Sequence, residues 1–357
     1  MSLPRRRIAD RQTERVTATS DVSRLGIAVG HATDEASATG LTVIRGIEQP
    51  LRAGVAIYGR ATGTRELHAA SPDHGVEGRV DAIVLTGGSA YGLGAVSGVT
   101  RWMEERGRGL PVGGGVVPIV PAAVVFDLAP LGRFDARPTA DMAYDATERA
   151  SPIVVEGSVG AGTGTTVGKL RGPALAMKGG FGCAVEELPG GDVVVAAMTV
   201  VNAFGDVRDA NGQVLAGARS ERGGFADALA ILRAGEISTP ATFGDLAMRD
   251  TTLAVVAANV PLSAVELTQL ARAAGAAFFK RITPAATSFD GDIVFAVSPM
   301  DGTRWERGVE GAGRRGRFAP MIIEALAVAA LERAIERAVR LARGRDGVPG
   351  LADDHGH

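Results

Sequence analysis

Apolar and polar positions along the chain predict a protein in which strands and helices are interleaved. Runs of apolar, β-branched residues predict buried strands at 82–85, 193–201, 253–260 and 293–297. Apolar residues at helical spacing predict helices at 140–150, 225–234, 263–279 and 320–343. Because the two kinds of element alternate, the fold class is α/β or α+β.

Two of these helices carry recognisable end signals. Ser263 and Glu266 form an S-x-x-E capping box directly before the apolar positions of the 263–279 helix. The last helix opens at Pro320 and has arginines near its end, which is the order that helix termini favour.

The remaining pattern predicts a single catalytic domain at 23–343. A basic segment, 1–22, precedes it and a tail, 344–357, follows it, and we expect both to be flexible. Polar, glycine-rich stretches at 216–224 and 235–250 are the expected exposed loops.

Composition excludes several functional classes. Hydrophobic residues make up 46% of the 357 and charged residues 22%, an ordinary globular balance. The net charge of −2 argues against a nucleic-acid partner, which requires an excess of Lys and Arg. The basic N-terminus has no apolar stretch, and glycine and proline interrupt the apolar region at 112–131, so neither a secretory signal nor a membrane span is predicted. We therefore expect a cytoplasmic protein.

Several familiar motifs are approached but not met. Lys169 is followed by Leu170 where a phosphate loop has Ser or Thr, and Val167 stands where a dinucleotide motif has its third glycine. The segment 87–92 has Tyr91 where a serine-nucleophile elbow requires glycine. No His, Cys or Asp cluster has metal-ligand spacing. The sequence therefore predicts no cofactor and no metal.

The single cysteine, Cys183, lies in an apolar run, and the five histidines offer it no obvious partner. A lone thiol cannot form an internal disulfide. We interpret Cys183 as a small buried residue and not as a nucleophile.

Thr251 is the residue that best fits a nucleophile. It follows a polar loop and opens a predicted core strand, which is the layout that self-cleavage before a threonine requires. Once freed, the α-amine has an ordinary pKa near 7.7–8.0 and can act as general base for its own hydroxyl. One residue would then supply both nucleophile and base.

Ordered motifs on both sides of Thr251 strengthen this interpretation, at 26–33, 85–93, 159–164, 168–169, 200–202, 251–253 and 290–296. Together they resemble the L-aminopeptidase/D-esterase family, which includes β-peptidyl aminopeptidases and nylon-oligomer hydrolases. The resemblance extends from about residue 22 to about residue 300, and the final helix is also in its expected place.

The resemblance implies a self-processing N-terminal-nucleophile hydrolase with a four-layer αββα sandwich. Cleavage of the Asp250–Thr251 bond would give chains 1–250 and 251–357, with Thr251 as nucleophile. Members of the family assemble as homo-tetramers of the processed pair, so the same assembly is expected here. The implied substrates are small amine-terminated peptides, β-peptides, amides or esters.

The resemblance also implies roles for four other residues. Asp290 would hold and polarise the threonine amine and hydroxyl, with Ser288 completing the network. Asn202 would donate its side-chain amide to the oxyanion. Lys169 would keep the α-amine neutral and basic through its charge.

Two positions depart from the family pattern and leave alternatives open. Asp250 stands where relatives have Asn or Gly, and Phe126 stands where many have Tyr. Ser288 matches the β-aminopeptidases rather than the nylon hydrolases, which have Asp there. The alternatives are an acyltransferase of the ornithine acetyltransferase type and an unprocessed, non-catalytic relative.

Overall fold

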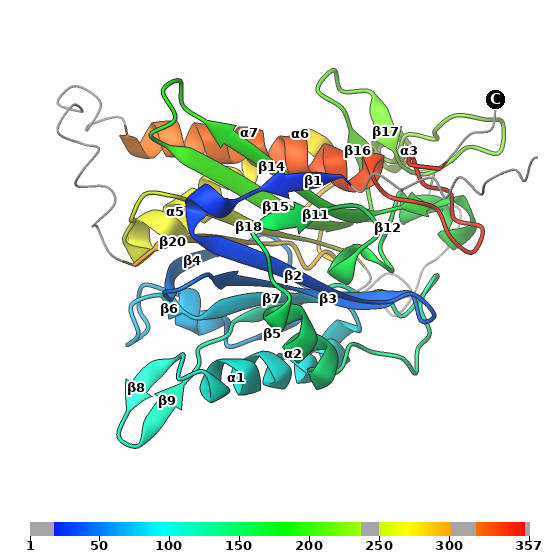
Figure 1. Ribbon diagram of the computed structural model, residues 1–357. Helices are drawn as coiled ribbons and strands as arrows, with labels where there is room; N and C mark the ends of the chain where they lie inside the picture. Colours follow the sequence, from blue (N-terminus) through cyan, green and yellow to red (C-terminus); the bar gives the residue numbers. More distant parts are fainter. Residues whose placement is uncertain (1–17, 237–249, 301–318, 354–357) are drawn as a thin grey trace, which may run out of the picture.

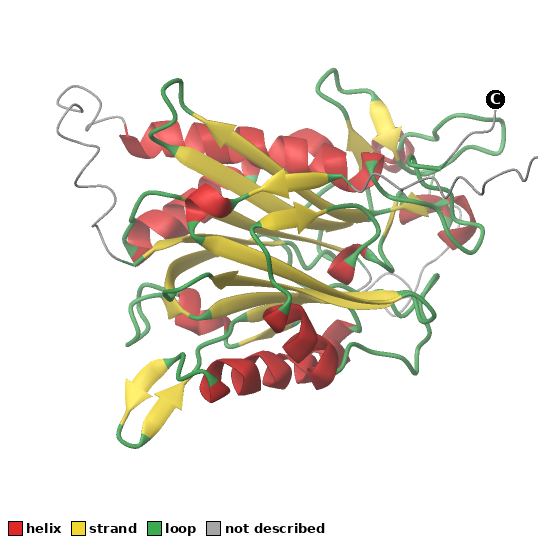
Figure 2. Cartoon of the chain, in the orientation of Figure 1, coloured by secondary structure: helices red, strands yellow, loops and turns green. Residues whose placement is uncertain are grey.

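The computed structural model describes residues 18–236, 250–300 and 319–353 as four stacked layers (Figure 1). Two sheets lie face to face in the middle, and helices cover the outer face of each, as the colouring of Figure 2 makes plain. The predicted four-layer αββα architecture is confirmed.

The lower sheet in Figure 1 has five strands in the order β2-β3-β7-β10-β5. Their bounds are β2 (Ile27–Asp34), β3 (Thr39–Gly46), β7 (Ala82–Thr86), β10 (Ala122–Val124) and β5 (Thr64–Arg65). Strands β7 and β10 run parallel, and the other neighbours run antiparallel.

The upper sheet has six strands in the order β14-β15-β18-β20-β4-β6. Their bounds are β14 (Gly180–Glu187), β15 (Val194–Asn202), β18 (Thr251–Ala258), β20 (Ile293–Pro299), β4 (Leu51–Ile57) and β6 (Arg79–Val80). Only the β18–β20 pair is parallel among these neighbours.

Strand β18 is buried on both faces, which is why an apolar run in the sequence predicted it. All 8 of its residues are buried, because helices cover one face of the sheet and the second sheet covers the other. Ala254 and Val256 pack into the core under the helices, whereas Leu253 and Val255 pack between the sheets. This alternation is the ordinary two-residue period of a strand.

The described residues contain six α-helices: α1 (Val96–Glu105), α2 (Ala140–Glu148), α3 (Ala228–Ala234), α5 (Ala264–Ala274), α6 (Ala276–Arg281) and α7 (Ala319–Arg340). Helices α5, α6 and α7 cover the six-stranded sheet, and α1 and α2 cover the five-stranded one. Three buried clusters fill the spaces between the four layers.

Short elements connect these layers. The paired strands are β1 (Thr19–Asp21) with β11 (Ile153–Val155), β8 (Leu110–Val112) with β9 (Gly115–Val117), and β12 (Thr166–Val167) with β13 (Met177–Lys178). A three-stranded sheet contains β17 (Val214–Ala216), β16 (Asp206–Arg208) and β19 (Ile282–Thr283). The 3-10 helices include η3 (Ser89–Ala95), η4 (Gly160–Gly162) and η5 (Lys169–Arg171).

The four strands and four helices expected from the sequence are present, with one interruption. The capping box of Ser263 and Glu266 is confirmed, but the helix predicted at 263–279 divides at Gly275 into α5 and α6. The Tyr58 ring lies against Gly275, where a Cβ would come within 2.0 Å of it. Its hydroxyl also bonds with the carbonyls that end α5, which explains the break.

The predicted ends of the domain were placed too far inward. Within the predicted flexible segment 1–22, residues 19–21 form β1 and pair with β11. Within the predicted tail 344–357, the Pro349 carbonyl accepts the Lys178 N–H at 2.9 Å, and the Asp353 side chain accepts the Gly344 N–H at 2.6 Å. Residues 1–17 and 354–357 lie outside the described residues.

The two predicted loops have different outcomes. Residues 221–224 are exposed as expected, but 216–218 are buried, and the Ala218 N–H donates to the Asp206 carboxylate at 2.8 Å. Most of the predicted loop at 235–250 lies outside the described residues. In the described ranges, no helix is long and apolar enough to cross a membrane.

Candidate active site

The sheet register brings the predicted nucleophile to a meeting point of strand ends. Thr251 is the first residue of β18 and pairs with Asn202, the last residue of β15. Its neighbour Asp250 forms an isolated parallel bridge with Asp290, just before β20. Residues far apart in the chain therefore meet where three neighbouring strands of the six-stranded sheet, β15, β18 and β20, begin or end.

The Thr251 hydroxyl faces the peptide bond before it. Thr251 is 4% exposed, and its Oγ1 donates to the Asp250 carbonyl oxygen at 2.6 Å. The Gly291 N–H donates to the same carbonyl oxygen at 2.9 Å. That oxygen is thus polarised by a backbone donor that the sequence interpretation did not identify.

Lys169 contacts the side chain of Asp250, whereas Thr251 and Gly291 contact its main-chain carbonyl. Its Nζ donates to Asp250 Oδ1 at 2.8 Å, to the Asn202 carbonyl at 2.9 Å and to Asn202 Oδ1 at 3.0 Å. The ion pair is well buried, with side chains 15% and 4% exposed. Gly168 directs Lys169 inward through a left-handed backbone, with φ of 68°.

The Asn202 side-chain amide has a defined orientation. Its Oδ1 accepts the Thr166 N–H at 3.1 Å, and its Nδ2 donates to the Phe126 carbonyl at 3.1 Å. A backbone donor on one side and a backbone acceptor on the other determine which end is oxygen. The contact runs through the Phe126 main chain, so it does not depend on the tyrosine hydroxyl that Phe126 lacks.

Two buried carboxyl groups flank the strand ends. Asp290 Oδ2 accepts the Thr287 N–H at 2.6 Å. Burial is the main cause that raises the pKa of Asp290, and the nearby charge of Asp250 adds to it. The hydrogen bonds from Thr287 act in the opposite direction but do not cancel the rise. Asp292 accepts the Thr252 N–H at 2.6 Å and the Ala286 N–H at 3.0 Å.

The second carboxyl group, Asp292, was missed by the sequence interpretation. Burial, followed by the charge of Asp290, raises the pKa of Asp292 to about 7. Its signal in the sequence was the two-residue spacing of Asp290 and Asp292 before a strand, since such spacing directs side chains to one face.

Ser288 does not join this group. It lies in the turn before Asp290 and is exposed, and within the described part of the chain its hydroxyl has no hydrogen-bond partner. Of the predicted site residues, the structure therefore gathers Thr251, Asp250, Asn202, Lys169 and Asp290, and leaves Ser288 outside.

The glycine-rich segment that resembled a phosphate loop has a packing role beside this site. A Cβ on Gly162 would come within 2.4 Å of the Phe181 backbone nitrogen, so the segment passes directly over β14. The Gly162 carbonyl accepts from the buried Lys178 ammonium at 2.8 Å. Cys183 is fully buried, which confirms its interpretation as a packed residue, and burial raises the pKa of its thiol.

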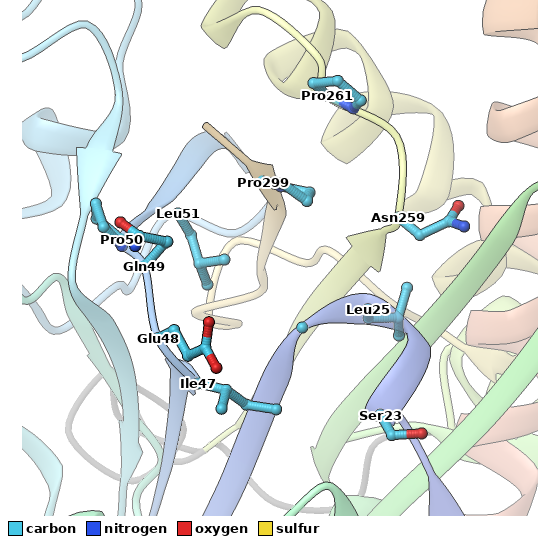
Figure 3. Close-up of a pocket in the computed structure, with 11 residues that line it drawn as sticks. Ser23, Leu25, Ile47, Glu48, Gln49, Pro50, Leu51, Asn259, Pro261 and Pro299 are labelled. Atoms are coloured by element: carbon cyan, nitrogen blue, oxygen red, sulfur yellow. The ribbon is translucent and has the colours of Figure 1, made fainter. Parts of the chain in front are cut away.

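A pocket lies at the opposite end of β18 from Thr251 (Figure 3). Asn259, which follows the last residue of β18, lines it together with Leu25 and Pro299, and its cavity volume is about 330 Å³. None of the predicted site residues is among its lining residues. The group around Thr251 is therefore the better candidate for the chemistry.

Comparison with known proteins identifies the family. A profile described as Peptidase family S58 matches residues 18–352. The chain belongs to peptidase family S58. This S58 chain is 40% identical to an uncharacterised aminopeptidase of Mycobacterium tuberculosis, over 76% of this chain and 79% of that one. It is 31% identical to the 6-aminohexanoate-oligomer endohydrolase of Kocuria sp., over 76% of this chain and 73% of that one.

Solved structures agree on the fold. The S58 chain superposes on a β-aminopeptidase of Burkholderia sp. with a TM-score of 0.63 and 22% identity, covering 91% of this chain and 88% of that one. It superposes on the L-aminopeptidase D-Ala-esterase/amidase of Ochrobactrum anthropi with a TM-score of 0.62 and 18% identity, covering 93% and 91%. The latter is described as a variant of the Ntn hydrolase fold. The predicted family and fold are confirmed, and the chain is a hydrolase of the aminopeptidase and amidohydrolase kind.

Proposed function

We propose that this S58 hydrolase cuts its own Asp250–Thr251 bond and then uses Thr251 to hydrolyse small amine-terminated peptides, amides or esters. The observation that carries the proposal is that Thr251 and Gly291 both donate a hydrogen bond to the carbonyl oxygen of Asp250. Thr251 Oγ1 lies 2.6 Å from that oxygen and the Gly291 N–H lies 2.9 Å from it. Acyl transfer requires a nucleophile next to the carbonyl group and a hydrogen-bond donor for the negative charge that develops on the carbonyl oxygen.

Self-cleavage would proceed in two steps. Thr251 Oγ attacks the Asp250 carbonyl carbon as the hydroxyl proton passes to a base. The oxyanion that forms accepts a hydrogen bond from the Gly291 N–H. The C–N bond then breaks, the leaving nitrogen takes a proton, and an ester joins Asp250 to Thr251. Water opens this ester and leaves a carboxylate on Asp250, with a free hydroxyl and a free amine on Thr251.

We assign the proton transfer to the buried carboxyl pair. Asp292 accepts the N–H of Thr252, the residue next to Thr251, at 2.6 Å. Burial and the charge of Asp290 raise the pKa of Asp292 to about 7, so a proton transfer at this group near neutral pH is supported. Asp290 is bridged to Asp250 through the main chain, which supports a role for it next to the bond proposed to be cut. Asp290 would share in this proton transfer, and after cleavage its further proposed role is to hold the Thr251 amine.

Hydrolysis of a substrate would repeat the same chemistry with a different acyl group. The α-amine of Thr251 takes the hydroxyl proton, Oγ attacks the substrate carbonyl, and the amine portion leaves with that proton. Asn202, which pairs with Thr251 across the sheet, is the second proposed donor to the oxyanion. Lys169 would favour the neutral, basic form of the α-amine through its charge.

The relatives favour hydrolysis over acyl transfer, since those matched here are named as aminopeptidases and as an oligomer endohydrolase. The unprocessed alternative receives no support from Asp250 itself, because its carbonyl faces Thr251 Oγ1. A cytoplasmic location and a homo-tetramer of processed pairs stay predictions.

Intact-mass measurement tests the proposal. We expect the purified protein to contain two chains, divided after Asp250, and Thr251→Ala to remain whole. Thr251→Ser is the matched control, since it keeps the hydroxyl and should still be cut. The processed protein should release p-nitroaniline from amino-acid p-nitroanilides, and Thr251→Ala should not. A whole chain that hydrolyses these amides without Thr251 would overturn the mechanism.

A further inference from the structure

Asp250 occupies the place of a substrate's acyl residue, if the function proposed above holds. The hydroxyl that attacks the Asp250 carbonyl during processing is the one that later attacks the substrate carbonyl. The acyl residue of a substrate must therefore present its carbonyl where Asp250 presents its own, 2.6 Å from Thr251 Oγ1 and 2.9 Å from the Gly291 nitrogen. The surroundings of the Asp250 side chain then describe the subsite for that residue.

The wall of this subsite is cationic. Asp250 is 3% exposed, and its Oδ1 lies 2.8 Å from Lys169 Nζ, a contact deep enough for charge to matter. Hydrogen bonds between a buried ammonium and a carboxylate are stronger than those between neutral groups. The precursor thus already contains an acidic acyl residue paired with a lysine.

Lys169 does not depend on Asp250 for its position. Its Nζ also donates to the Asn202 carbonyl at 2.9 Å and to Asn202 Oδ1 at 3.0 Å. Asn202 is held in turn by the β15–β18 pairing and by the Thr166 N–H. These contacts belong to the sheet, so they persist when the segment ending in Asp250 withdraws.

We infer that the mature enzyme prefers substrates whose acyl residue carries a carboxylate, with α-aspartyl amides as the simplest class. An aspartyl residue restores the anionic partner of Lys169. A neutral acyl residue of similar size excludes water from the ammonium and returns only neutral acceptors, which is costly at a buried cation. The carboxylate of Asp290 opposes a second negative charge here, so the preference rests on direct contact with Lys169.

The test compares two substrates of nearly equal shape. Processed wild-type protein, verified as two chains by intact mass, is assayed at neutral pH with the p-nitroanilides of L-aspartate, L-asparagine and L-alanine. We expect kcat/KM for the aspartyl amide to exceed that for the asparaginyl amide at least about tenfold, the ratio that 1.4 kcal/mol provides. Equal or better hydrolysis of the asparaginyl or alanyl amide overturns the inference and leaves the proposed function intact.

Failure of the proposed function has a separate signature. A preparation that stays whole and hydrolyses none of the three amides overturns that function, and with it this inference. A second measurement uses the chain as its own substrate: Asp250→Asn keeps the shape and removes the charge. We expect its processing to be at least about tenfold slower than that of wild type. Processing of Asp250→Asn at the wild-type rate would also overturn the inference.

Discussion

Gly291 lies so close to Thr251 that a Cβ at position 291 would stand 2.8 Å from the Thr251 hydroxyl oxygen. The same glycine donates its N–H to the Asp250 carbonyl. The residue that polarises this carbonyl thus also leaves space for the Thr251 hydroxyl, the proposed nucleophile, and a side chain at position 291 would enter that space.

Gly291→Ala should therefore slow self-cleavage strongly. The added methyl group displaces Thr251 Oγ1 and shifts the backbone donor, and loss of one oxyanion donor costs on the order of 10²–10³ in rate. The measurement is a time course of precursor disappearance on a denaturing gel. Gly94→Ala is the control, because a Cβ there meets nothing within 4 Å, and it should process normally. Wild-type processing of Gly291→Ala would remove Gly291 from the mechanism.

Ser288 and Asp290 should separate clearly when each is replaced. Ser288→Ala should process within about twofold of wild type, because the hydroxyl is exposed and lies outside the site. Asp290→Asn should slow processing by on the order of 10²–10⁴, the usual contribution of a positioned acid or base. Both are followed by intact mass. A strong effect of Ser288→Ala would restore the network implied by the family resemblance.

The stability of the precursor should fall as pH rises from about 4 to about 6, in part because of Asp127. This carboxyl accepts the Gly88 N–H at 2.6 Å and the Thr39 hydroxyl at 2.7 Å, and burial raises its pKa from 3.8 to about 6. A raised carboxyl pKa means that the folded state binds the proton more tightly. The stabilisation is complete below pH 3.8 and is lost as pH rises through 6.

Asp127→Asn should remove this part of the pH dependence. The amide can accept from Gly88 and donate to Thr39, so the fold should tolerate it. Across this interval the variant should lose less stability than its parent, by on the order of 2–3 kcal/mol, since each unit of pKa is worth about 1.4 kcal/mol. Urea unfolding of Thr251→Ala, with and without Asp127→Asn, measures the difference at several pH values. Parallel curves for the two proteins would contradict the assignment.

Arg337 on α7 should be important for stability although it is far from Thr251 in the chain. Its guanidinium forms two hydrogen bonds, of 2.8 and 2.6 Å, with the buried carboxylate of Glu156. Arg337→Met leaves that carboxylate without its counter-charge and should cost about 3 kcal/mol. Urea unfolding of the Thr251→Ala precursor measures it. The control is Arg149→Met, whose exposed pair with Asp145 should contribute less than about 1 kcal/mol.

Much of the fold could be predicted from the sequence because its signals are local. Continuous apolar runs reported strands such as β18, since both faces of that sheet are covered. The capping box of Ser263 and Glu266 reported the start of α5, since it satisfies donors within one helical turn. The break at Gly275 could not be predicted, because it depends on Tyr58, which directly follows β4 and is distant from α5 in the sequence.

The site divides in the same way. The sequence by itself determined that Thr251 opens a core strand after a polar segment, and the motifs around it indicated the family. Tertiary structure alone decided that Gly291 donates to the Asp250 carbonyl, that Asp292 is buried with a raised pKa, and that Ser288 stays outside. These features depend on strand register and burial, which arise from contacts between distant segments and leave no periodic signal along the chain.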